Sequence, residues 1–140
     1  MSLPPFAITD DADLEDAVRD KTSYDDNADE WPTTQASGNI EDAKRSLYIK
    51  TGSDEWYQDV GYGHALVTMT ALKAKEAVEN INIDSYGIGN ENLSFANADP
   101  DDSQQIRSWS SEVNEALDES EINFEKTQNL SLKNTSNYIG

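Results

Sequence analysis

The sequence predicts a mainly α-helical fold: a small bundle of about four helices around a long central helix, with an inserted β-hairpin and an extended C-terminal arm. Apolar residues recur every three or four positions in four stretches, as on the buried face of a helix. Before the last stretch the spacing changes to two, as in a hairpin. After residue 120 only isolated apolar pairs remain. We therefore expect a helical domain over 1–120, with the hairpin at about 81–96, and an arm over 121–140.

The first helix is expected to have Thr9 as its N-cap and to run to about Lys21. Aspartates follow Thr9 directly, where carboxylates favour the positive end of the helix dipole. Residues 22–38 are polar and contain Pro32 and Gly38, so they predict a loop. Trp31 lies in this loop and needs a packing partner.

A second helix is expected over about 39–52, ending at Gly52, because glycine favours the left-handed conformation after a helix. Its apolar residues share one face: Ile40, Ala43, Leu47 and Tyr48. The same helix carries the one basic cluster of the sequence: Lys44, Arg45 and Lys50. This cluster is either a solvated face or a contact with an acidic neighbour, including a second copy of the chain.

The longest periodic stretch predicts the central helix, capped by Ser53. Its apolar positions are Trp56, Val60, Gly63, Val67, Ala71, Ala74, Val78 and Ile81. A second apolar stripe beside the first indicates burial on several sides. Glycine costs roughly 1 kcal/mol against alanine inside a helix, so Gly61 and Gly63 indicate a close packing partner or a kink.

A hairpin follows around Gly89-Asn90, because alternating apolar residues flank a turn dipeptide: Ile81, Ile83, Tyr86, Ile88, Leu93 and Phe95. An isolated two-stranded hairpin is marginally stable, so it needs a helix beneath it or strands of another chain beside it. The last helix is expected from Asp99 as N-cap, with Pro100 at its first position, to about Glu119. Its inward residues are Ile106, Trp109, Val113, Ala116 and Leu117.

The arm has no helical period, and its apolar residues are sparse: Ile122, Phe124, Leu130, Leu132, Tyr138 and Ile139. A segment without a core of its own either stays disordered or folds on a partner. The alternation favours the second outcome, because an extended segment can add a strand to a neighbouring sheet edge.

The charge of the 140-residue chain is strongly negative, with 28 Asp and Glu against 10 Lys and Arg, a formal net charge of −18. Such a charge excludes an unaided duplex-DNA-binding surface. Asp-rich surfaces with few lysines are typical of molar-salt cytoplasm, where repulsion is screened over about 3 Å, so we expect a halophilic source; an acidic mesophilic protein is the alternative. No membrane span of roughly 20 apolar residues and no signal peptide is found, so a soluble intracellular protein is expected.

Chemistry-bearing motifs are absent from the sequence. With no cysteine, disulfides, thiolate zinc sites and cysteine nucleophiles are excluded. Acidic loops starting at Asp25 and Asp99 lack the glycine and glutamate that a calcium loop requires. His64 has no second ligand at helical spacing and predicts a packed or interface histidine. We therefore expect no enzyme activity, no cofactor and no metal.

The stretch around the predicted hairpin carries a more specific pattern than the rest of the sequence. An Ala- and Leu-rich helix precedes Ile83-Asp84-Ser85-Tyr86-Gly87-Ile88-Gly89-Asn90-Glu91-Asn92-Leu93-Ser94-Phe95, and a helix containing Ala116-Leu117 follows. This order resembles the head-tail adaptor (connector) proteins of tailed viruses, in which a hairpin interrupts a helical bundle before its last helix. The lead Phe6-Ala7-Ile8-Thr9 resembles the opening of that family, whereas the long stretch 22–38 departs from it.

The resemblance implies a virion protein at the head-tail junction, assembled in the host cytoplasm. Its subunits would form a ring, usually of twelve, on the portal protein, line part of the DNA channel without specific DNA binding, and present a platform for tail or head-completion proteins. The composition then points to a virus of a haloarchaeon. Candidate subunit and portal contacts are the basic cluster, the hairpin and the arm.

Two other functions stay open. An acidic protein can mimic DNA in the basic groove of a nucleic-acid-binding protein, and a halophilic helical binding domain of another kind has the same composition. Mimicry predicts carboxylates in phosphate-like rows on one face. In this sequence they concentrate at helix starts and loops, as caps and salt adaptation require.

Overall fold

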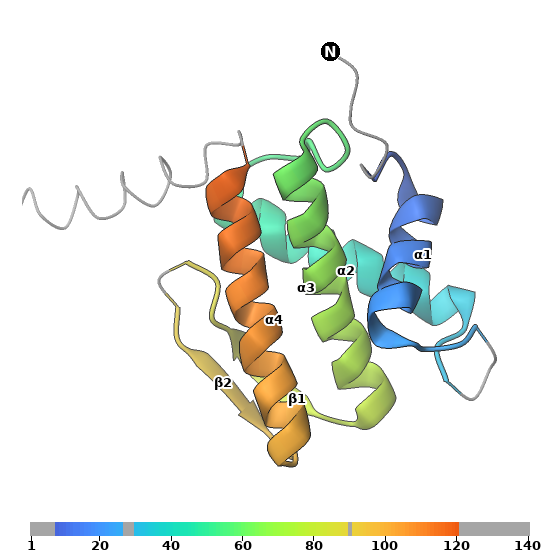
Figure 1. The fold of residues 1–140 in the computed structure, drawn as a ribbon, viewed down its shortest axis with the longest axis vertical. Coiled ribbons are helices and arrows are strands. Elements are labelled where there is room, and N and C mark those ends of the chain that lie inside the picture. The colour runs from blue at the N-terminus through green and yellow to red at the C-terminus, as the bar shows by residue number, and fades with distance from the viewer. Residues whose placement is uncertain (1–7, 27–29, 90, 121–140) are drawn as a thin grey trace, which may run out of the picture.

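The computed structural model describes residues 8–26, 30–89 and 91–120, and its described part is a helical bundle with one hairpin (Figure 1). The elements, in order, are α1 (Asp11–Thr22), α2 (Thr33–Thr51), α3 (Val60–Glu79), β1 (Asn82–Tyr86), β2 (Leu93–Ala96) and α4 (Pro100–Glu119). The predicted class, helices with a hairpin inserted before the last one, is confirmed. The predicted arm over 121–140 lies outside the described residues.

The first two helices begin at different residues from those expected. Asp10, not Thr9, is the N-cap of α1, because its carboxylate accepts a hydrogen bond from the Asp13 amide. The loop prediction for 22–38 is wrong in its second half, since α2 begins at Thr33 directly after Pro32. The end of α2 is as predicted, with Gly52 at φ 73°.

The α2 start depends on a contact between residues eight positions apart. Trp31 is fully buried, and its indole Nε1 donates a 2.8 Å hydrogen bond to Oδ1 of Asn39. Arg19 of α1 lies over the Trp31 ring at 4.9 Å and donates to the Trp31 carbonyl at 2.9 Å. Trp31 therefore has the packing partner that the sequence required, and it ties α1 to the first turns of α2.

The central helix is α3, and it is buried along most of its length. It starts at Val60 with Asp59 as N-cap, not at Ser53, because Trp56 folds back and stacks on Tyr62 with ring centroids 5.1 Å apart. Figure 1 shows α1 and α4 on either side of α3, with α2 crossing behind. This arrangement explains why its apolar residues occupy more than one stripe.

A close approach of α4 explains Gly61. A Cβ atom at Gly61 would lie 2.8 Å from the Ala116 carbonyl oxygen and from two backbone atoms of Ser120. The predicted close packing partner is therefore the end of α4. This last helix has the predicted cap at Asp99, whose carboxylate accepts from the Asp102 amide, and it ends at Glu119 as expected.

The hairpin pairs β1 with β2 in antiparallel register, with Ile83 opposite Phe95 and Tyr86 opposite Leu93. The register shifts between Ile83 and Ser85, so Asp84 is an extra residue of the kind that a β-bulge inserts. The connection runs from Gly87 to Asn92 and is longer than the two-residue turn predicted at Gly89-Asn90. Gly87 and Gly89 both have positive φ, at 72° and 68°.

Candidate interaction surface

The hairpin is held by helices of its own chain. Ser110 of α4 donates to the Tyr86 carbonyl at 2.7 Å. Asn114, one turn later, donates to the Gly87 carbonyl and accepts from the Gly89 amide, both at 2.9 Å. The helix that the hairpin requires is therefore supplied by α4.

Glu91 organises the hairpin connection. Its Oε1 accepts from the backbone amides of Tyr86 and Ile88 at 3.0 and 3.3 Å, and its Oε2 lies 3.0 Å from Nζ of Lys50 in α2. Partial burial alone would raise the pKa of Glu91, but the hydrogen bonds from Lys50 and the two amides outweigh it and hold the pKa below its usual value. This carboxylate links α2 to the hairpin.

Tyr86 is the half-buried aromatic residue at the end of β1. Its hydroxyl donates to Oε1 of Glu76 at 2.7 Å, and Lys73 lies over its ring at 4.2 Å. Burial and the neighbouring Glu76 raise the pKa of the Tyr86 hydroxyl far above its usual value, whereas burial lowers the pKa of Lys73. Tyr86 thus joins β1 to α3, and its hydroxyl stays protonated near neutral pH.

The three residues of the basic cluster point to different partners. Lys44 pairs with Asp11 of α1 at 2.9 Å, and Tyr57 also donates a hydrogen bond to that carboxylate. Partial burial would raise the pKa of Asp11, but the hydrogen bonds from Tyr57 and Lys44 lower it overall. Lys50 pairs with Glu91, while Arg45 is 69% exposed and, among the described residues, pairs only with Asp42 of its own helix. Of the cluster, Arg45 is the residue most open to a partner.

The predicted hairpin contacts divide into core and surface. Ile83 and Ile88 are 6% and 2% exposed and belong to the core of the chain itself, so neither is available at the surface of the described structure. Leu93 and Phe95 are half-buried, and Arg107 lies over the Phe95 ring at 5.3 Å. The six arm residues lie outside the described part of the chain: Ile122, Phe124, Leu130, Leu132, Tyr138 and Ile139.

Sequence reasoning missed a groove between α2 and β1. Its volume is about 260 Å³, its α2 side includes Leu47 and Ile49, its β1 side includes Ile88, and Met69 of α3 also lines it. Ile49 is 73% exposed and the adjacent Tyr48 is 51% exposed, so placing Tyr48 on the buried face was wrong. A sequence indication existed for Ile49, because two residues after Leu47 it falls on the opposite side of the helix.

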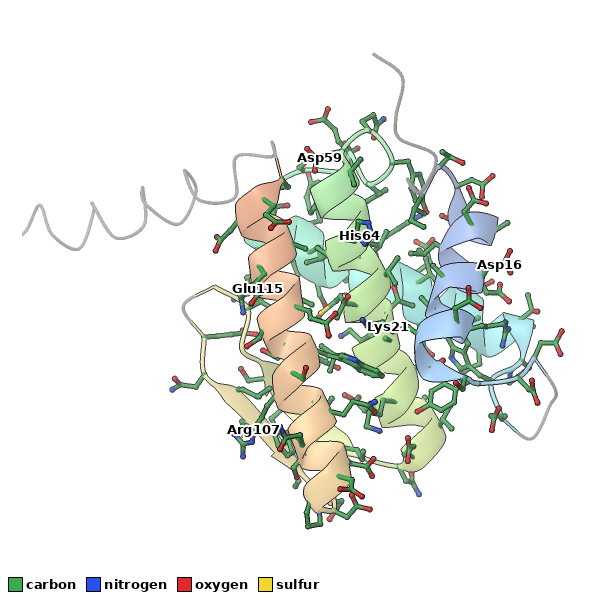
Figure 2. All side chains as sticks on the ribbon, viewed as in Figure 1. Asp16, Lys21, Asp59, His64, Arg107 and Glu115 are labelled. Atoms are coloured by element: carbon green, nitrogen blue, oxygen red, sulfur yellow. The ribbon has the colours of Figure 1, made fainter. Side chains whose placement is uncertain are left out.

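The one histidine, His64, lies on the remaining polar surface of the described residues. His64 is exposed on α3 and not packed, contrary to the first of the two roles expected of it. It shares a shallow groove with Lys21 and Glu115, from α1 and α4 (Figure 2). Among the described residues, no three His, Asp or Glu side chains are placed to hold a metal ion. None of the described helices is long and apolar enough to cross a membrane.

Comparison of the chain with protein-family models, with curated proteins and with solved structures finds no match.

Proposed function

We propose that this chain is a structural virion protein that forms a ring between the portal and the tail of a tailed virus, most simply one that infects a haloarchaeon. In that ring, each subunit lines part of the DNA channel and contributes to a platform for tail or head-completion proteins. The observation that carries the proposal is the order of elements. A two-stranded hairpin stands between the long central helix and the last helix, where the resemblance expects it.

The surface supports an assembling protein in two further ways. The sheet of the described residues has two strands, so each strand has one edge without a strand partner, and such edges pair readily with other chains. Two adjacent residues of α2, Tyr48 and Ile49, are exposed, and Ile49 lines a groove, as at many protein contact sites. Copies at −18 each would repel one another in dilute buffer, so assembly should require high salt.

The test is an affinity purification of the tagged full chain from infected cells, kept in molar KCl and analysed by mass spectrometry. Recovery of portal and tail-completion proteins in stoichiometric amounts is expected. Recovery of a host nucleic-acid-binding protein without them would favour the DNA mimic and overturn the proposal.

A matched pair of variants tests the basic cluster within that assembly. Arg45→Glu reverses an exposed charge on α2, and we expect it to reduce recovery of the portal protein. Arg107→Glu makes the same change of charge on α4, where Arg107 lies over Phe95 of the hairpin; a loss of recovery confined to this variant would assign the contact to the hairpin and not to the α2 cluster. Equal losses for both variants would mean that net charge, not the α2 cluster, controls the interaction.

A further inference from the structure

We propose that the groove between α2 and β1 binds the C-terminal segment of the chain, residues 126–140, through Leu130 and Leu132. The proposal concerns contacts made by this protein alone, so it holds or fails independently of the viral role. The contact is the same whether the segment reaches the groove of its own chain or that of a second copy.

The groove combines an aliphatic floor with a polar rim that includes the paired Lys50 and Glu91. Leu47, Met69 and Ile88 form the floor and are each at most 2% exposed, so the accessible aliphatic side chain is that of Ile49, which is 73% exposed. Its volume of about 260 Å³ lies below the roughly 300–1,000 Å³ of sites for drug-sized ligands. It is therefore suited to one or two side chains of a peptide segment.

The charge of the C-terminal segment is opposite to that of the rest of the chain. All 28 acidic residues precede residue 126, and residues 126–140 contain two lysines, Lys126 and Lys133. The side chains of this segment carry a formal charge of +2. The rest of the chain therefore carries −20, which gives the net charge of −18. The acidic domain therefore attracts this segment and repels other acidic parts of the chain.

Specific groups match across the contact. Leu130 and Leu132 alternate with polar residues, so both lie on one face of an extended segment. Asp84 lines the groove, is exposed, and makes no ion pair within the described part of the chain. Leu130 and Leu132 thus face the apolar lining, while Lys133 lies close enough in sequence to pair with Asp84.

Backbone pairing with the end of β1 contributes little. The Tyr86 amide already donates to Glu91, and the Tyr86 carbonyl accepts from Ser110. The contact therefore depends on the two leucine side chains, and its specificity is measurable by substituting them.

The length of chain after α4 is sufficient. Ser120 lies against Gly61, and Met69 is eight residues further along α3, about 12 Å at 1.5 Å per residue. Leu130 is ten residues after Ser120, which spans up to about 33 Å when extended. Ile122 and Phe124 lie only two and four residues after Ser120, and they stand between Glu121 and Glu125. The acidic domain repels these two glutamates, so Leu130 and Leu132 fit the groove better than Ile122 and Phe124 do.

The absence of cysteine makes disulfide trapping in the full chain direct. Ser46 lines the groove, so Ser46→Cys places one thiol there. Gln128 is on the same face of an extended segment as Leu130, so Gln128→Cys supplies the second thiol. The matched control combines Gln128→Cys with Asp16→Cys, an exposed position on α1 (Figure 2). We expect the groove pair to oxidise at least about tenfold faster than the control pair, within one chain or between two copies, because binding raises the effective concentration.

Two further variants separate specific binding from chance collision. Adding Leu130→Asp and Leu132→Asp to the groove pair should return its oxidation rate to that of the control pair. Adding Ser131→Asp, which changes charge but keeps both leucines, should leave most of the rate advantage. Equal oxidation rates for the groove and control pairs, or no effect of the double aspartate change, would overturn the proposal.

Discussion

Replacing Gly61 with alanine tests the packing of α3 against the end of α4. In an exposed helix this change stabilises, because alanine is favoured over glycine by about 1 kcal/mol. At Gly61 the new Cβ would lie 2.8 Å from three backbone atoms of Ala116 and Ser120, which cannot move aside as a flexible side chain can. Overpacking of this kind costs about 1–3 kcal/mol, and three contacts with backbone atoms put Gly61 in the upper part of that range, at about 2–3 kcal/mol. After the gain of about 1 kcal/mol from alanine, we expect a net loss of about 1–2 kcal/mol.

Gly38 provides the matched control. It lies in the exposed part of α2, and a Cβ there would meet nothing within 4 Å. Gly38→Ala should therefore gain about 0.5–1 kcal/mol. Thermal unfolding in molar KCl, followed by far-UV circular dichroism, should give a Tm lower by about 4–8 °C for Gly61→Ala and higher by about 2–4 °C for Gly38→Ala. A Tm that rises for both variants would refute the close approach of α4 to Gly61.

Three other predictions concern charge. Lys75 is 3% exposed and pairs with Glu79 and Asp102 at 2.9 and 2.8 Å; Lys75→Met leaves both carboxylates without their cation and should lower the free energy of unfolding by about 2 kcal/mol in urea titrations. Asp11 and Glu91 have pKa values below those of the unfolded chain, so the stability that they contribute is present above about pH 4.5 and is lost as the pH falls through the folded pKa values. Glu91→Gln should therefore make the free energy of unfolding less dependent on pH in this range, and an unchanged pH dependence would contradict the role of Glu91. Raising KCl from about 0.1 to 1 M should raise Tm by screening the net charge of −18, which scanning calorimetry can measure.

The helix boundaries show where local sequence rules succeed. Asp99 with Pro100, and Gly52 after α2, are strong local cap patterns, and both ends are confirmed. The start of α2 was missed because its first turns are polar and contain Gly38. Those turns are held by Asn39 and by Trp31 packing under Arg19, a contact that helical periodicity does not report.

The candidate surface shows the same division. The sequence identified the basic cluster, but not that Lys44 and Lys50 pair with Asp11 and Glu91. Their partners lie 33 and 41 positions away, so only the packing of α1 and the hairpin beside α2 brings the charges together. Arg45 then remains as the exposed member of the cluster.

By itself, the sequence determined the order of the elements, most of their buried faces and the helical class. These properties follow from interactions within a few residues, such as capping, the 3.6-residue period and the alternation of strands. The tertiary structure decided which apolar residues stay exposed, how Lys75 is neutralised, and that α2 and β1 flank a groove. These features depend on residues far apart in the chain, whose distances are fixed only when the helices pack.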